Sequence, residues 1–193
     1  MDNISKKNSG LETAYKTLKE MASARKAWWK TTEGENHAKR LELDKAVVKS
    51  FCDEILSEEN NALLRALEQR PWLLIEILFT IVDKNARTVP FFLNDVQAEF
   101  IVIIEKRGFN KLHPYVILKG RQQGFTSLIT AIQLSFMICR ENFSGLTLAD
   151  VSNKTIELFE KKGKQVYERI SDERFKPKKV RDNLNMLSFA QPN

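Results

Sequence analysis

The first 85 residues repeat apolar side chains with the period of an α-helix. Apolar positions recur every three or four residues, and polar stretches such as 31–35 separate the repeats. Pro71 is well placed in the first turn of the last of these stretches. The pattern predicts helices at 11–29, 36–56, 61–68 and 71–82. For the second helix it predicts an apolar face made of Leu41, Ala46, Val47, Phe51 and Ile55. Residues 1–85 are therefore predicted to form an all-helical N-terminal region.

From residue 86 onward, short apolar runs alternate with helical stretches. Asn94 and Asp95 give an N-cap signal for the first of these helices. The predicted strands are 115–118, 145–149 and 186–190, and the predicted helices are 96–106, 128–140 and 152–170. Strands and helices that alternate in this way are typical of a parallel sheet with right-handed crossovers. The fold class predicted for residues 86–193 is α/β, with an incomplete parallel sheet.

The loop between the first predicted strand and the next helix has features of a phosphate-binding loop. Gly120 and Gly124 allow the backbone to curl so that its N–H groups point inward. Thr126 and Ser127 open the following helix, whose free N–H groups and dipole favour an anion. The hydroxyl of Thr126 is placed to bind Mg²⁺. The alternative that the sequence leaves open is an ordinary strand–turn–helix with two glycines.

The loop departs from the usual pattern G-x-x-x-x-G-K-[ST] at two positions. Lys119 replaces the first glycine, and Phe125 replaces the lysine that normally precedes the hydroxyl. The β- and γ-phosphates of a nucleotide still need a cation. Lys119 and Arg121 both lie in the loop, and either can supply that charge.

The nine residues KGRQQGFTS resemble the deviant Walker A loop of the terminase large subunit of tailed bacteriophages. Lys119 matches the relocated lysine of that family, Phe125 its aromatic residue, and Arg121 the arginine that is implied to act catalytically near the γ-phosphate. The resemblance implies a P-loop NTPase fold of the RecA/ASCE-like type for residues 86–193. The nucleotide-binding residues that it implies in the loop are Lys119, Gly120, Arg121, Gln122, Gln123, Gly124, Phe125, Thr126 and Ser127, with Thr126 also binding Mg²⁺.

A second segment of the same resemblance lies upstream, at residues 92–100. Its Gln97 matches the glutamine that contacts the adenine ring, and an amide can both donate to and accept from the adenine edge. Gln97 precedes Lys119 by 22 residues, which suits one helix, one loop and one strand.

The resemblance also implies the function of the parent protein. Such proteins are ATP-driven motors that move double-stranded DNA into proheads, and they carry an endonuclease as well. The implied ligands are ATP and Mg²⁺. The implied partners are double-stranded DNA, the portal protein and the small terminase subunit, in the cytoplasm of the host cell and without a membrane.

A Walker B element, an apolar strand that ends in Asp-Glu, is missing from the 193 residues. Asp150 comes nearest, but Val151 follows it, so we interpret Asp150 as the end of the second strand. There is also no room for a nuclease domain. We therefore expect an N-terminal piece of a longer protein, which by itself binds ATP weakly or not at all and does not hydrolyse it.

Positive charge is concentrated in one part of the chain, whose net charge is +6. Residues 151–181 contain ten Lys or Arg and five Asp or Glu. Such a segment can neutralise DNA phosphates, and the candidate contacts are Lys161, Lys162 and Lys164. The alternative is a solvated helix face that contacts no partner.

The remaining composition narrows the possible classes. Cys52 and Cys139 lie far apart within apolar patterns, and we interpret them as reduced core residues. His37 and His113 have no Cys or His neighbour at ligand spacing, which argues against zinc. Two other functions stay open. One is a P-loop helicase with a glutamine motif, and the other is a non-enzymatic assembly or binding module.

Overall fold

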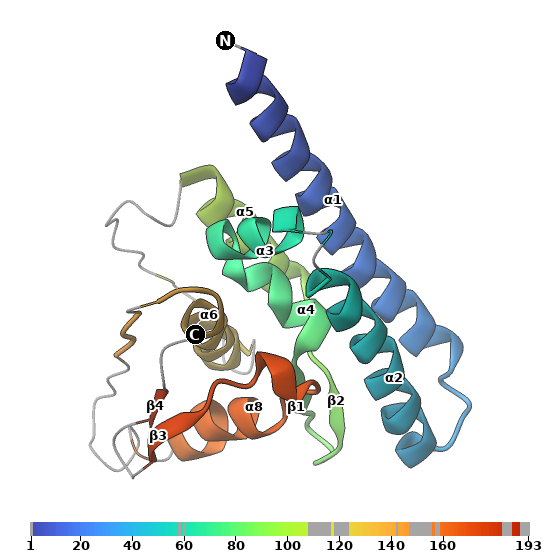
Figure 1. The fold of residues 1–193 in the computed structure, drawn as a ribbon. Coiled ribbons are helices and arrows are strands. Elements are labelled where there is room, and N and C mark those ends of the chain that lie inside the picture. Colours follow the sequence, from blue (N-terminus) through green and yellow to red (C-terminus); the bar gives the residue numbers. More distant parts are fainter. Residues whose placement is uncertain are drawn as a thin grey trace.

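The computed structural model describes residues 2–57, 59, 61–107, 117, 124–141, 143–146, 156, 159–182 and 187–189. Its elements are α1 (Asp2–Thr31), α2 (His37–Ile55), α3 (Asn61–Gln69), η2 (Pro71–Leu73), α4 (Leu74–Leu78), β1 (Thr80–Val82), β2 (Thr88–Pro90), α5 (Asp95–Arg107), α6 (Phe125–Cys139), η3 (Phe159–Lys164), α8 (Gln165–Glu168), η4 (Glu173–Phe175), β3 (Lys179–Asp182) and β4 (Leu187–Phe189). Figure 1 shows α1 as a long helix whose N-terminal end extends beyond the rest of the molecule.

The predicted helices of the N-terminal region form up to residue 78, but α1 begins at Asp2, nine residues before the predicted start of the first helix. Asn36 caps α2, because its side-chain oxygen accepts a hydrogen bond from the Ala38 N–H at 2.9 Å. The predicted face of α2 is confirmed at Ile55, which is fully buried, but elsewhere the buried face lies about one position away. The structure buries residues spaced four and three apart, namely Arg40, Asp44, Val48, Cys52 and Ile55. Two charged residues belong to this face because each has a partner on α1 that a pattern of apolar residues alone does not reveal. Asp44 pairs with the fully buried Arg25, and Arg40 contacts the carbonyl and the ring of the half-buried Trp29.

The predicted helix at 71–82 ends early. A 3₁₀ turn leads into α4, the backbone becomes extended at Phe79, and the β-branched run from Thr80 forms strand β1. The side chain of Asp83 accepts hydrogen bonds from the N–H groups of Asn85 and Arg87 and so closes a turn into β2. Residues 83–90 therefore form the turn and the second strand of an antiparallel hairpin.

The described strands form two antiparallel pairs, β1 with β2 and β3 with β4. β4 coincides with the predicted strand at 186–190, and its partner β3 was not predicted. The strands predicted at 115–118 and 145–149 lie mostly outside the described residues. The parallel sheet therefore stays a prediction. Part of the predicted helix at 152–170 is a π-helix, η3, which leads into α8.

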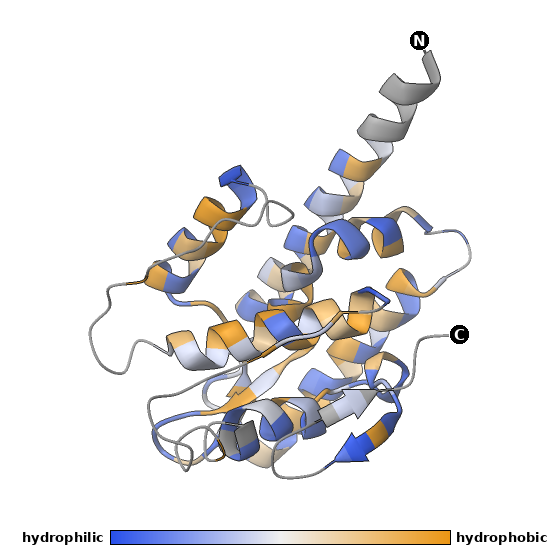
Figure 2. Ribbon diagram, turned by 90° about the vertical axis from the view of Figure 1, so that its left-hand side faces the viewer, coloured by the Kyte–Doolittle hydropathy of each residue, from blue (hydrophilic) through white to orange (hydrophobic). Residues whose placement is uncertain are grey.

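Helix α6 lies in the middle of the molecule. It packs against η2, α3 and α4 from the N-terminal region and against η3 and α8 from the C-terminal part. Its buried side chains join those of α1 to α4 in one hydrophobic core, which extends from Ala14 to Phe175 in the sequence. Figure 2 shows apolar residues gathering where the helices meet. The N-terminal helices and the loop-bearing part thus depend on a shared core.

Two further predictions concern the environment of single features. Cys52 is buried, and burial raises the pKa of its thiol to about 12, as expected of a reduced core residue. Within the described part of the chain, no helix combines the length and the apolar character that a membrane span requires.

Candidate nucleotide-binding site

The helix that follows the predicted phosphate loop begins at Gly124. This residue is the N-cap of α6 and has the left-handed conformation, with φ 71° and ψ 13°. The first helical hydrogen bond runs from the Leu128 N–H to the Gly124 carbonyl, at 3.0 Å. Within the described part of the chain, no side chain caps this helix end. Its first-turn amides and the helix dipole therefore form the type of environment that binds an anion.

Gln97 lies against this helix start, although the sequence separates the two residues widely. Its side-chain Nε2 donates a hydrogen bond to the Gly124 carbonyl at 3.1 Å. Its Oε1 accepts from the Asn94 N–H at 3.1 Å, while the Gln97 N–H donates to the Asn94 side chain at 3.0 Å. This reciprocal pair is a capping box, and it confirms Asn94 as the N-cap of α5. The structure thus brings together two predicted site residues, Gln97 and Gly124.

Gly124 must be glycine for two reasons. A positive φ of 71° is strained for residues with a side chain. A Cβ atom here would also lie 2.8 Å from Nε2 of Gln97. The close approach of Gln97 therefore uses the space that the missing side chain leaves.

Phe125 has its side chain in the core. It is 5% exposed, and its ring meets that of Phe100 from α5 edge to face, with centroids 5.5 Å apart. Phe125 is also the first residue of α6, which begins three residues before the predicted helix at 128–140. The aromatic side chain packs α5 against α6, and only the backbone of Phe125 remains for contact with a phosphate.

Thr126 and Ser127 occupy the first turn of α6, as predicted, and both are half-buried. The carbonyl of Thr126 accepts a hydrogen bond from the Thr130 hydroxyl at 2.8 Å. Among the described residues, no group of three or more His, Cys, Asp or Glu side chains is arranged to hold a metal ion. In a phosphate-binding loop the Mg²⁺ contact from the chain is a hydroxyl at the helix start, and for Thr126 this role stays a prediction.

The rest of the predicted loop lies outside the described residues. This applies to Lys119, Gly120, Arg121, Gln122 and Gln123. Asp150 lies outside them as well. Their predicted roles, including the catalytic role of Arg121, stay predictions.

The predicted DNA contacts lie in η3. Lys164 forms ion pairs with Glu160 at 2.6 Å and with Asp182 of β3 at 2.7 Å. Hydrogen bonds that the Lys164 ammonium donates to the carboxylates of Asp182 and, as the second cause, Glu160 raise the pKa of Lys164 above its ordinary value. Lys162 is half-buried, and the side chain of Lys161 is not described. The charge of Lys164 is therefore balanced within the fold.

Sequence reasoning missed the residues that hold the entry to α5. Glu76 of α4 accepts a hydrogen bond from the Leu93 N–H through Oε1, at 2.9 Å. Arg25, fully buried, donates to the carbonyls of Glu76 and Phe79 at 3.1 and 3.3 Å. The signal in the sequence was Arg25, a charged residue on the apolar face of its helix. A charged residue in such a position needs a buried partner.

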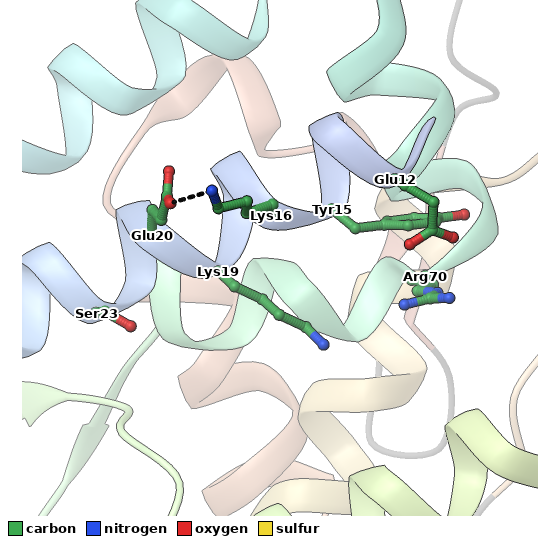
Figure 3. A pocket seen from close by; sticks show the side chains of 7 residues that line it. All are labelled: Glu12, Tyr15, Lys16, Lys19, Glu20, Ser23 and Arg70. Carbon is green, nitrogen blue, oxygen red and sulfur yellow. Dashed lines mark ion pairs between the residues drawn. The ribbon is translucent and has the colours of Figure 1, made fainter. Parts of the chain in front are cut away.

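A surface hollow of about 320 Å³ lies along α1 (Figure 3), lined by Glu12, Tyr15, Lys16, Lys19, Glu20, Ser23 and Arg70. The guanidinium of Arg70 stacks over the Tyr15 ring at 3.8 Å, and Lys19 pairs with Glu105 of α5 at 3.6 Å. The hollow contains none of the predicted site residues, and its charges have mixed signs.

Comparisons of the chain with protein-family models, with curated proteins and with solved structures find no match.

Proposed function

We propose that this chain is the ATP-binding portion of a DNA-packaging motor of the terminase large-subunit type. One observation supports this proposal above the others. Gln97 and Gly124 belong to two separate segments that resemble the family, and they are in direct hydrogen-bond contact at 3.1 Å. A chance glycine loop after a strand gives no reason for the second family segment to lie beside it.

In this proposal the start of α6 binds the phosphates of ATP. The first-turn amides donate to phosphate oxygens, and Lys119 and Arg121 supply positive charge from the loop. Thr126 holds Mg²⁺, which neutralises charge on the β- and γ-phosphates when bound. The residues of this chain thus bind and orient the nucleotide.

For the parent protein we propose ATP-driven DNA packaging. There, ATP hydrolysis drives double-stranded DNA into proheads, with the portal protein and the small terminase subunit as partners in the host cytoplasm, and a nuclease cuts the DNA. The basic segment that contains Lys161, Lys162 and Lys164 faces DNA phosphates. Lys164 would exchange a carboxylate partner for a phosphate, because Glu160 and Asp182 now hold it.

The first test is a titration with a fluorescent ATP analogue and Mg²⁺. We expect weak, saturable binding by the chain and its loss in Lys119→Ala, because the loop cation is removed. Lys84→Ala, which changes an exposed lysine in the β1–β2 turn, is the matched control and should bind like the unchanged chain.

Equal binding by Lys119→Ala and the unchanged chain would remove the loop from the proposal. Phosphate release should not exceed that of a Thr126→Ala variant, since no Walker B carboxylates are present in the sequence. Steady-state hydrolysis above that level would contradict this expectation.

A further inference from the structure

The amide of Gln97 is engaged at both of its polar atoms. Nε2 donates to the Gly124 carbonyl, and Oε1 accepts from the Asn94 N–H. The residue is only 3% exposed. A glutamine that recognises a purine base must present its own donor and acceptor to that base. In this structure, Nε2 serves the start of α6 and Oε1 the start of α5, and the second N–H and lone pair of the amide belong to a side chain that is almost wholly buried.

The surroundings of Gln97 hold it in this position. The capping box with Asn94 fixes the first turn of α5, and the Glu76 carboxylate holds the Leu93 N–H one residue earlier. One turn further along α5, Phe100 packs against Phe125. These contacts on both sides hold the first turn of α5, which carries Gln97, beside the start of α6.

Gly124 has no room for a side chain beside the amide of Gln97. A Cβ atom would approach Nε2 of Gln97 to 2.8 Å, and the φ of 71° excludes most other residues. The amide of Gln97 and the absent side chain of Gly124 are therefore complementary. Such complementarity is typical of a contact that fixes the conformation of a backbone.

We propose that Gln97 is a positioning residue of the phosphate-binding part of the site and does not recognise the base. It holds the carbonyl of Gly124 and thereby orients the first-turn amides of α6 toward a triphosphate. This inference rests on the proposed function, and it narrows the ligand class. The site recognises the triphosphate, and Gln97 does not select adenine over guanine.

The test compares three ligands on four proteins. ATP, GTP and inorganic tripolyphosphate, each with Mg²⁺, displace the fluorescent ATP analogue from the unchanged chain, from Gln97→Glu and from Gln97→Met. Glu keeps the acceptor for Asn94 and loses the donor for Gly124, whereas Met loses both. Gln133→Met is the matched control, because it removes a hydrogen bond from a side chain of α6 to the Leu146 carbonyl, away from the helix start.

The expected result is a loss of affinity of about tenfold for all three ligands in both Gln97 variants, the size expected when a buried hydrogen bond is broken. The control should bind like the unchanged chain. A loss confined to ATP would show base recognition and overturn the inference, while leaving the proposed function intact. Unchanged affinity for all ligands would overturn it as well. If the chain bound none of the three, the same variants would be measured in the parent protein, and absence of binding there would overturn both the proposed function and this inference.

A second measurement tests the contact without any ligand. Gly124→Ala lowers stability through backbone strain and through the clash with Gln97. In a Gln97→Ala background only the strain remains, so the fall in urea midpoint caused by Gly124→Ala should be smaller there. Equal falls in both backgrounds would show that Gln97 does not hold Gly124, and the inference would be wrong.

Discussion

Arg25 and Asp44 form a buried ion pair that joins α1 to α2. Two hydrogen bonds connect the guanidinium to the carboxylate, Nε to Oδ1 at 2.8 Å and Nη2 to Oδ2 at 2.6 Å. Arg25 is fully buried, and Asp44 is 1% exposed. Nη1 of Arg25 donates to the carbonyls of Glu76 and Phe79, where α4 changes into β1. One side chain therefore connects the helical hairpin to the segment that leads into α5.

Replacing one partner of this pair should strongly destabilise the protein. Asp44→Ala leaves a buried guanidinium without its carboxylate, which costs about 3–5 kcal/mol of unfolding free energy. Urea denaturation followed by circular dichroism measures the change. Lys45→Ala, which breaks an exposed pair with Glu42, is the control and should cost no more than about 1 kcal/mol. A similar cost for both variants would contradict the structural role of the buried pair.

The hydrogen bond from the Leu93 N–H to the Glu76 carboxylate should stabilise the conformation of the segment that leads into α5. Glu76→Ala leaves the Leu93 N–H without this acceptor, which costs about 1–3 kcal/mol. Glu76→Gln keeps a carbonyl oxygen and should retain most of the stability. Hydrogen exchange at the Leu93 amide should be faster in the Ala variant and close to normal in the Gln variant. Equal exchange in both would argue against the contact.

Lysine at position 125 should not restore a usual phosphate loop. Phe125 is buried against Phe100, so Phe125→Lys loses the packing of the ring and forces a charge into the core. The loss of the buried aromatic alone costs about 3–5 kcal/mol. Val96→Lys, at a position 44% exposed on α5, is the control and should leave the urea midpoint almost unchanged. Tighter ATP binding by a stable Phe125→Lys variant would show that this position faces the nucleotide.

Arg174 of η4 forms an ion pair with Asp53 of α2 at 2.6 Å and a second one with Asp172, and acid should weaken this cluster through Asp172. The Arg174 guanidinium bonds its carboxylate at 3.0 and 2.7 Å and holds the pKa of Asp172 below its ordinary value. A carboxyl whose pKa is lower in the folded state stabilises the fold above its unfolded pKa of about 3.9. That contribution is lost as the pH falls from there through the lower, folded value.

Asp172→Asn should therefore make the unfolding free energy less dependent on pH below about pH 4. The variant should still show some acid sensitivity, because Asp83 and Asp182 also have lowered pKa values. Urea unfolding at a series of pH values measures the effect. An unchanged pH dependence in Asp172→Asn would remove Asp172 from this explanation.

The basic segment should affect DNA binding in the parent protein. Lys161→Glu and Lys162→Glu are combined with Lys164→Gln, because a carboxylate at 164 would face Glu160 and Asp182. Each lysine that contacts a phosphate should lower the slope of log affinity against log salt by about one. DNA-stimulated ATPase activity should fall as well. The control changes exposed lysines of the helical region to Glu, at Lys30, Lys39 and Lys45. Unchanged ATPase activity in the triple variant would exclude this segment.

The sequence predicted much of the helical part correctly, because period and caps are local. The capping signal at Asn94 is one example. The strand around 187–189 was also predicted from a local pattern. The face of α2 was wrong because Asp44 is buried by Arg25, 19 residues away in the sequence. The end of the predicted helix at 71–82 was wrong because the β-branched residues from Thr80 pair with a strand whose turn is closed by Asp83.

For the candidate site, the sequence by itself determined which residue types stand in the loop and that a helix follows Gly124. These features depend on residues close together in the chain, so their pattern is visible there. Only the tertiary structure decided that Gln97 reaches the carbonyl of Gly124 and that Phe125 turns into the core. Both depend on how α5 packs against α6, and that packing follows from contacts between residues 25 or more positions apart. No local period or motif specifies such contacts, because they form only when separate elements come together around a shared core.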